Sequence, residues 1–322
     1  MTRLPTRPAP FIQRGLTLIE LMIAMLLGLI VVSGVLGIFA SNSEAYRLTG
    51  DLARVQENAR VAVQLMGRSM REAGGNPCGL PSSVGLIHHM AEAPTSNWWS
   101  GGDNFSSSLV GYRGGSGFPS GANGGITMVP GSDAVVTVSG NAFAKAVISD
   151  TASPGMIVHS NAGFATGDIL FACSTERGLG AVFQAGTISA SGGNWSVARA
   201  NPFSGAVASM TVTNLGKLNA EAWFVGENSR GGTSLYRAAI GSGQPEEVAQ
   251  DVSDMQITYL LPNADQYVAA NLISSIDWPE VTAAYIELTI SRRINSETTI
   301  ERKVGMTANL RNRTILDAGS PP

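Results

Sequence analysis

One apolar run near the start of the chain limits what this sequence can fold into. Residues 16–40 carry a single charged side chain, Glu20. At about 1.5 Å per residue, a helix of this length covers roughly 37 Å, more than the ~30 Å hydrocarbon core of a bilayer. No other stretch of the 322 residues is as long and as apolar. We therefore expect one membrane helix and a large remainder that folds outside the lipid.

The charges on either side of this run predict its orientation. Residues 1–15 contain Arg3, Arg7 and Arg14 and no acidic residue, whereas Glu44 and Asp51 follow the run. The positive-inside rule then places the N-terminus in the cytoplasm and the bulk of the chain outside. The run is too long for the apolar core of a secretory signal peptide, which spans roughly 7–15 residues. An ordinary single-pass anchor explains everything except Glu20.

Glu20 is the feature that a simple anchor leaves unexplained. A carboxylate inside a membrane helix costs about 2.5–3.5 kcal/mol on insertion scales, so such groups usually have a partner and a function. Cleavage between Gly15 and Leu16 would create an α-amino group at Leu16. Its positive charge is a suitable partner for Glu20 of a neighbouring copy, in the membrane or in a filament.

The string Arg14-Gly15-Leu16-Thr17-Leu18-Ile19-Glu20 resembles the class III leader junction of type IV pilins and pseudopilins. The resemblance implies that residues 1–15 are a leader and that a prepilin peptidase cuts after Gly15. It also implies methylation of the new N-terminus at Leu16 and a role for Glu20 in guiding assembly. Leu16 stands where major pilins usually carry Phe, which favours a minor pilin.

The helical pattern continues beyond the apolar run. Between Pro10 and Pro77 there is no proline, and Gly74 and Gly75 give a strong stop signal. We expect one helix over residues 16–73, with an apolar half at 16–40 and an amphipathic half at 41–73. Its stripe is expected to pack on the protein's own sheet, a coiled coil with another chain being the alternative. The stripe consists of Leu48, Leu52, Val55, Ala59, Ala62, Met66 and Ala73.

Residues 74–322 are predicted to form a β-rich head, so the fold class is α+β: a long N-terminal helix packed on an antiparallel, pilin-like head. The clearest strand is residues 281–291, whose apolar and polar side chains alternate. No strand is followed by a convincing crossover helix, which argues against a parallel sheet. Residues 100–125 are rich in Gly and Ser and are predicted to be a loop. Further strands are expected at residues 134–139, 156–159, 168–173, 181–184, 222–225, 234–238, 255–261 and 299–307.

The chain has two cysteines, Cys78 and Cys173. A head outside the cytoplasm lies in an oxidising compartment, so we predict a disulfide between them that ties the helix end to the sheet. Closing a loop of about 95 residues would contribute roughly 4–5 kcal/mol. Two free buried thiols are the alternative.

No residue pattern predicts catalysis, a cofactor or a metal centre. His88 and His89 are adjacent rather than four apart on a helix, and phosphate-loop, dinucleotide and hydrolase motifs are missing. Only 14% of residues are charged and the net charge is -3, which argues against nucleic-acid binding. Trp98 and Trp99 are either a binding platform or, as we favour, a lid over the core.

Phrases spread over the head resemble the PilW family of minor pilins: residues 167–170, 223–228, 234–237, 252–259 and 310–313. The resemblance implies a low-abundance, non-enzymatic subunit that primes type IV pilus assembly near the tip and so supports twitching motility and adhesion. Implied partners are the prepilin peptidase, the major pilin, other minor pilins, a large tip adhesin and inner-membrane lipid, with the head in the periplasm. The alternatives are a minor pseudopilin of type II secretion and a single-pass anchored surface-binding module.

Overall fold

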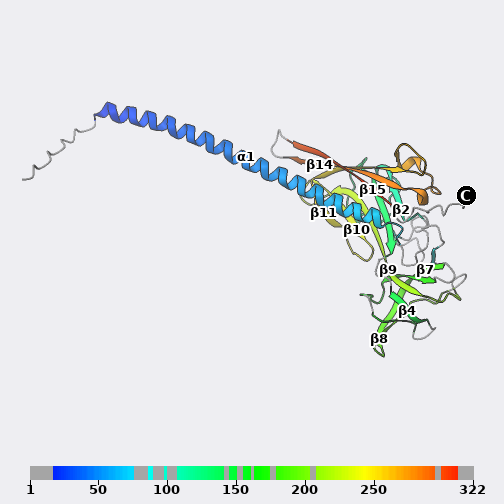
Figure 1. Cartoon of the computed structure of the whole chain (residues 1–322). Coiled ribbons are helices and arrows are strands. Elements are labelled where there is room, and N and C mark those ends of the chain that lie inside the picture. Colours follow the sequence, from blue (N-terminus) through cyan, green and yellow to red (C-terminus); the bar gives the residue numbers. More distant parts are fainter. Residues whose placement is uncertain are drawn as a thin grey trace, which may run out of the picture. The chain divides into compact units, whose positions relative to one another are not determined.

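The computed structural model describes residues 17–75, 86–89, 98–99, 107–140, 145–150, 155–160, 163–174, 179–203, 208–293 and 299–310. A 55-residue helix, α1 (Leu18–Glu72), precedes a series of strands that form two sheets (Figure 1). This confirms the predicted α+β class with one long N-terminal helix and an antiparallel β-rich head. The chain divides into two compact units, Met1–Ala53 and Arg54–Pro322.

The end of α1 follows the stop signal seen in the sequence. Gly74 takes a φ of 78°, a left-handed conformation that glycine adopts at little cost. The amide of Gly75 donates to the carbonyl of Glu72 at 2.9 Å, which satisfies one of the last helical carbonyls. Arg68 and Glu72 form an exposed pair at 2.8 Å, a contact that contributes little to stability.

The larger sheet has eleven strands, with the order β1-β7-β8-β5-β4-β9-β10-β11 along its main path. Three further strands lie off this path: β2 pairs with β3, β3 with β9, and β6 with both β7 and β9. Among the described strands only β1 runs parallel to its partner, β7. The strands are β1 (Leu86–His89), β2 (Leu109–Tyr112), β3 (Ala134–Gly140), β4 (Lys145–Asp150), β5 (Met156–Val158), β6 (Ile169–Ser174), β7 (Leu179–Ser191), β8 (Asn194–Arg199), β9 (Asn214–Glu227), β10 (Thr233–Ala239) and β11 (Glu246–Gln250).

The smaller sheet has the order β13-β12-β14-β15. Its strands are β12 (Val252–Leu260), β13 (Val268–Ala269), β14 (Ala283–Arg293) and β15 (Thr299–Asn309). In β14 the side chains of Ala284, Ile286, Leu288 and Ile290 are buried, which confirms the predicted apolar face. On the other face Tyr285 is exposed, whereas Thr289 is also buried. Three short 3-10 turns complete the described structure: η2 (Arg113–Gly115), η4 (Ala270–Leu272) and η5 (Trp278–Glu280).

The amphipathic half of α1 supplies one wall of the main core. Its buried side chains share a cluster with Trp223 of β9 and with Ile257 and Leu288 of the smaller sheet. The helix therefore packs on the protein's own strands, as expected from the stripe. The buried helical residues of this cluster are Val55, Ala59, Ala62, Met66 and Met70, and Ala73 follows the helix. Leu52 of the predicted stripe is 38% exposed.

Two glycines permit close approaches inside this core. A Cβ at Gly67 of α1 would collide with the terminal methyl of Met306, so the absence of a side chain at Gly67 leaves room for this methyl of β15 against the helix. A Cβ at Gly111 of β2 would collide with the Tyr259 hydroxyl in the same way. The two glycines thus allow close contact between elements that are far apart in sequence: α1 with β15, and β2 with β12.

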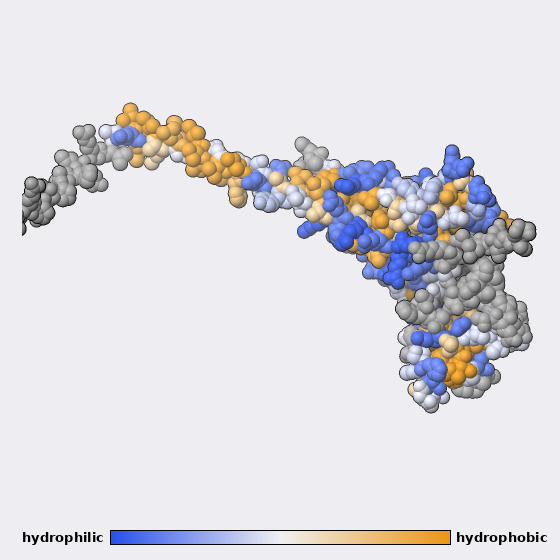
Figure 2. Space-filling view, viewed as in Figure 1, coloured by the Kyte–Doolittle hydropathy of each residue, from blue (hydrophilic) through white to orange (hydrophobic). Residues whose placement is uncertain are grey.

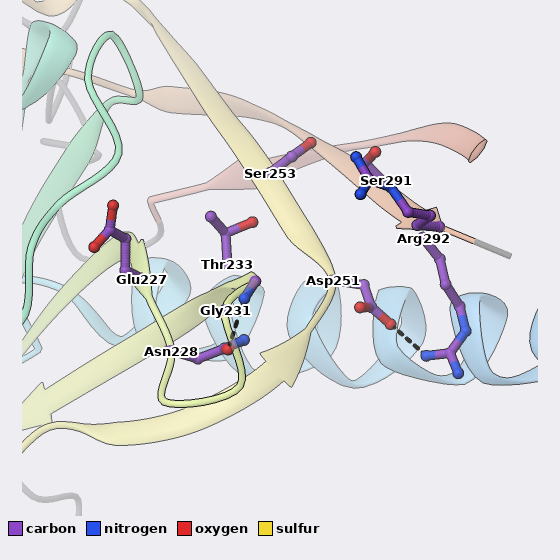
Figure 3. Close-up of a pocket in the computed structure, with 10 residues that line it drawn as sticks. Glu227, Asn228, Gly231, Thr233, Asp251, Ser253, Ser291 and Arg292 are labelled. Atoms are coloured by element: carbon purple, nitrogen blue, oxygen red, sulfur yellow. Dashed lines mark hydrogen bonds and ion pairs between the residues drawn. The ribbon is translucent and has the colours of Figure 1, made fainter. Parts of the chain in front are cut away.

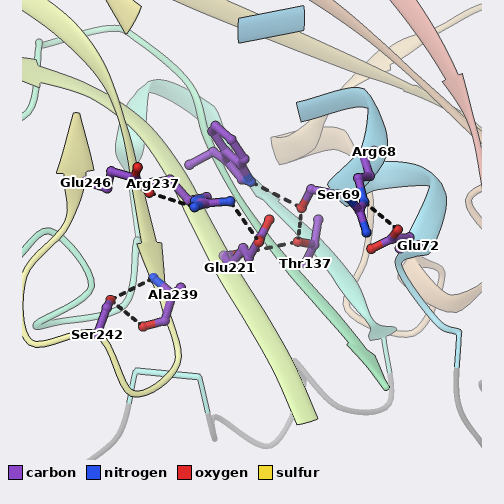
Figure 4. A network of polar contacts seen from close by, with 10 residues as sticks. Arg68, Ser69, Glu72, Thr137, Glu221, Arg237, Ala239, Ser242 and Glu246 are labelled. Atoms are coloured by element: carbon purple, nitrogen blue, oxygen red, sulfur yellow. Dashed lines mark hydrogen bonds and ion pairs between the residues drawn. The ribbon is translucent and has the colours of Figure 1, made fainter. Parts of the chain in front are cut away.

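A chain of buried polar contacts joins α1 to the larger sheet (Figure 4). The Ser69 hydroxyl lies 2.6 Å from the Thr137 hydroxyl on β3 and accepts the Trp223 indole N–H at 3.2 Å. Arg237 lies with its guanidinium 5.9 Å from the Trp223 ring centre and donates to Glu246 at 2.6 Å. Hydrogen bonds require particular directions, so the bonds of Ser69 to Thr137 and Trp223 fix which face of the helix meets the sheet.

A second polar cluster joins the two sheets. The buried carboxylate of Asp133 accepts the backbone N–H of Gly114 at 2.8 Å and of Ile257 at 2.9 Å, and Arg113 donates to it at 3.2 Å. Nearby, the fully buried Tyr259 has a pKa well above its ordinary value, because burial disfavours the phenolate and the negative charge of Asp133 adds to the effect. Tyr259 also packs edge-on against Trp278, with ring centres 4.9 Å apart.

The Gly- and Ser-rich stretch at residues 100–125 differs from its prediction. Residues 107–125 are described, and they contain β2, which pairs with β3, together with the turn η2. Ser107, Leu109 and Ala122 are buried. The prediction of a loop is wrong for Leu109–Tyr112, because pairing with the buried strand β3 outweighed a composition that is typical of loops, whereas residues 113–125 form turns and irregular structure.

We predict that Met66→Ala lowers the free energy of unfolding by about 2–5 kcal/mol, since Met66 is fully buried in the main core. Leu65→Ala is the matched control, because Leu65 is 36% exposed on the same helical turn. Chemical unfolding of the full chain in detergent measures both values. Equal, small effects for the two variants would show that the stripe does not pack on this protein's own sheets.

Candidate processing and assembly site

The first turn of α1 contains a reciprocal set of hydrogen bonds between Thr17 and Glu20. The Glu20 carboxylate accepts the backbone N–H of Thr17 at 3.2 Å and the Thr17 hydroxyl at 3.1 Å. In return, the Glu20 backbone N–H donates to the Thr17 hydroxyl at 3.4 Å. This is a capping box, in which a Thr before the helix and a Glu three residues later satisfy amides that have no helical partner.

The capping box gives the Glu20 carboxylate a partner within its own chain. A negative charge in the first turn is also favoured by the partial positive charge at a helix N-terminus. The carboxylate is thus held at the start of the helix before any other molecule arrives. Sequence patterns alone did not lead us to this arrangement, although the T-x-x-E spacing of Thr17 and Glu20 is typical of it.

The N-terminal part of α1 exposes its apolar side chains on every side. All residues from 17 to 42 are exposed, and Leu18 and Phe39 reach 78% and 73%. Figure 2 shows hydrophobic residues over the visible face of this segment. By length and composition, α1 is the one helix among the described residues that could cross a membrane.

The structure describes only some of the predicted site residues. Glu20 lies in the first turn of α1, whereas Gly15 and Leu16 lie outside the described residues. Cys173 is fully buried in β6, beside Gly180 of β7 and Asn214 of β9. Cys78 lies outside the described residues, so the disulfide stays a prediction.

The aromatic pair proposed as a platform or a lid contributes to the interior. Trp99 is 6% exposed and belongs to a core cluster with Phe171 and Leu218, and Trp98 is half-buried against the same cluster. A buried indole cannot serve as an exposed binding face, so the lid is the better description. Across the described residues, no group of three or more His, Cys, Asp or Glu side chains is arranged to hold a metal ion.

A polar pocket lies where the β9–β10 turn faces the beginning of β12 and the end of β14 (Figure 3). Asp251 separates β11 from β12 and has a φ of 63°, a left-handed conformation that Asp tolerates better than most residues. Its carboxylate accepts a hydrogen bond from Arg292 at 2.7 Å. On the other wall, Asn228 receives the backbone N–H groups of Arg230 and Gly232, both at 3.0 Å. No residue pattern predicted this pocket.

Comparison with known proteins identifies one feature. Residues 11–36 match the prokaryotic N-terminal methylation motif, a span that contains Gly15, Leu16 and Glu20. No curated protein and no solved structure matches the chain. The motif, together with the exposed apolar start of α1, supports a membrane-anchored type IV pilin-like or pseudopilin-like protein whose leader is processed by prepilin peptidase.

Proposed function

We propose that this chain is a minor pilin, similar to the PilW family, that primes or supports assembly of a type IV pilus without catalysing a reaction. The observation that carries the proposal is the position of Glu20. It is the only charge in residues 16–40, it lies in the first turn of an exposed apolar helix, and it falls within the N-terminal methylation motif.

The proposed mechanism begins in the inner membrane. Before assembly, α1 anchors the subunit with its head in the periplasm, and the bonds to Thr17 satisfy the Glu20 carboxylate within lipid. Cleavage after Gly15 leaves a positively charged amine on Leu16, which the peptidase then methylates. In a medium of low dielectric, that amine and Glu20 of an adjacent subunit attract strongly. The exposed apolar segments then bundle as the filament leaves the bilayer.

The proposed partners follow from this mechanism and from the head phrases. They are the prepilin peptidase, the major pilin, other minor pilins and a large adhesin at the tip. Assembly at the tip would support twitching motility and adhesion.

A minor pseudopilin of type II secretion is the second candidate, because the N-terminal methylation motif fits both machines equally well. Deletion of the gene distinguishes the two candidate functions. Loss of twitching motility with normal secretion supports the minor pilin, whereas loss of secretion with normal twitching supports the pseudopilin. A surface-binding module built on Trp98 and Trp99 loses support because Trp99 is buried.

The first test removes the charge of Glu20. We expect Glu20→Ala to be cleaved normally but to fall by about tenfold or more in filaments sheared from the cell surface, since about 1.4 kcal/mol already changes an equilibrium tenfold. Glu57→Ala is the matched control, being an exposed acidic residue further along α1. Immunoblots of membrane and filament fractions measure both. Normal recovery of the Glu20 variant in filaments would remove the charge-pairing mechanism.

The second test concerns the cleavage site. Gly15→Ala is expected to leave a precursor that retains residues 1–15, because the proposed junction lies after this glycine, which falls within the matched motif. Gly28→Ala should mature normally, as a Cβ at Gly28 meets no atom within 4 Å. Intact-mass analysis of protein from cells distinguishes precursor from product. Mature protein from the Gly15 variant would mean that the junction lies elsewhere.

The third test concerns the proposed disulfide between Cys78 and Cys173. We expect both thiols to resist alkylation in denaturant until a reductant is added. Cys173→Ser should lower the free energy of unfolding by roughly 2–5 kcal/mol, and the double variant with Cys78→Ser should cost no more than about that. Alkylation of both cysteines without reductant would show that they are free.

A further inference from the structure

Tyr46 is the most exposed aromatic side chain in the part of the chain that the structure describes. Its exposed fraction is 79%, against 38% for Tyr267 and 36% for Tyr285 of the head, and only Phe39 of α1 comes close, at 73%. Among the described residues none forms a hydrogen bond with the Tyr46 hydroxyl. The folded chain therefore uses neither the ring nor the hydroxyl of this tyrosine.

The position of Tyr46 along α1 relates it to the surface of a bilayer. Residues 21–40 contain no charged side chain, and at about 1.5 Å per residue they cover roughly 30 Å, the thickness of a hydrocarbon core. Tyr46 follows Ala40 by six residues, or roughly 9 Å of helix. Side chains on a helix lean toward its N-terminus, so the ring reaches back toward the lipid. That depth is the headgroup layer, which adds about 5–8 Å on each side of the core.

The face of α1 that carries Tyr46 changes its chemistry in the order that a lipid leaflet does. Phe39 and Tyr46 are seven residues apart and so lie on the same face, since two helical turns take about seven residues. Arg47, the next residue, is exposed as well. Tyrosine is enriched where membranes meet water, because its ring is apolar and its hydroxyl is polar. A guanidinium is well suited to pair with phosphate.

We propose that Tyr46 inserts into the headgroup layer of the leaflet nearer the head and fixes the depth at which α1 sits in the membrane. The partner is the phospholipid interface: the ring lies against the upper acyl chains, the hydroxyl bonds ester or phosphate oxygens, and Arg47 pairs with phosphate. The anchor thus extends past the apolar run to Tyr46. The inference requires only the membrane helix, and it holds for a pilus subunit and a secretion subunit alike.

The first test locates position 46 in the full chain, reconstituted in vesicles of phosphatidylethanolamine and phosphatidylglycerol. Phospholipids that carry a nitroxide quench indole fluorescence on contact, and the native chain, with five tryptophans, supplies the emission to subtract. We expect a nitroxide near the headgroup to quench Tyr46→Trp at least about twofold more than a nitroxide at the bilayer centre.

Two matched variants calibrate this depth. Ile30→Trp lies near the midpoint of residues 21–40, so the nitroxide at the bilayer centre is expected to quench it more strongly. Ala53→Trp lies on the same face as Tyr46 and two turns further on, at a position that is also exposed. It is expected to escape both nitroxides.

The second test asks whether Tyr46 fixes the depth of the helix. We expect Tyr46→Ala to lower the preference of Ile30→Trp for the central nitroxide by about twofold, because the helix can then shift along the membrane normal. Tyr267→Ala is the matched control, since it removes a partly exposed tyrosine of the head, and it is expected to change nothing. Circular dichroism checks that each variant is folded.

Two results at position 46 would overturn the proposal: no more quenching than at position 53, which places the ring in water, or strongest quenching by the central nitroxide, which places it in hydrocarbon. An Ile30→Trp profile that Tyr46→Ala leaves unchanged would show that the ring does not fix the depth. Normal incorporation of Glu20→Ala into filaments contradicts the proposed function and leaves these fluorescence results untouched.

Discussion

The packing of the last turns of α1 against both sheets is the interaction on which the head depends. Met66 and Met70 occupy the same core as Trp223 and Ile257, so the parts of both sheets that line this core would be exposed to water without the helix. Apolar packing alone tolerates rotation of a helix about its axis. The bonds of Ser69 to Thr137 and Trp223 remove that freedom, because a rotated helix would leave an indole N–H buried without an acceptor. Burial supplies the energy of this contact, and the polar groups select its geometry.

The beginning of the same helix meets a different requirement. Here the apolar side chains are exposed and the one carboxylate is bonded to its own helix terminus, so the segment satisfies its polar groups internally, as lipid demands. Glu20 serves as a local cap, and its two bonds to Thr17 join neighbouring residues, so they hold the carboxylate without help from any other element.

Local periodicity in the sequence predicted the fold better than it predicted the details of the head. The apolar run, the stripe through Val55 and Met66 and the stop at Gly74 identified α1, because a helix is encoded by periodicity within a few residues. The alternation in β14 worked for the same reason. β2 was missed because Leu109–Tyr112 is short and lies within Gly- and Ser-rich sequence, and its stability comes from β3, which is distant in the chain. The hydrogen-bond partners of Ser69 and Asp133 could not be predicted from the sequence, because no local pattern shows which distant strands will contact these residues. At the candidate site, the sequence motif identified Glu20. The capping role of Thr17 was not predicted, although the T-x-x-E spacing of Thr17 and Glu20 is typical of a capping box.

The corner at Asp251 has a consequence for how the head can vary. One residue, Asp251, separates β11 of the larger sheet from β12 of the smaller one. Arg292 of a third strand, β14, donates a hydrogen bond to its carboxylate. Lengthening the chain there would misalign β12 and every contact that it makes with the core. The turn at Gly192 and Gly193 joins β7 to β8 and has open space around both glycines. Insertions and epitope grafts therefore belong at that hairpin, and the single-residue corner is the place where homologous heads should keep their length.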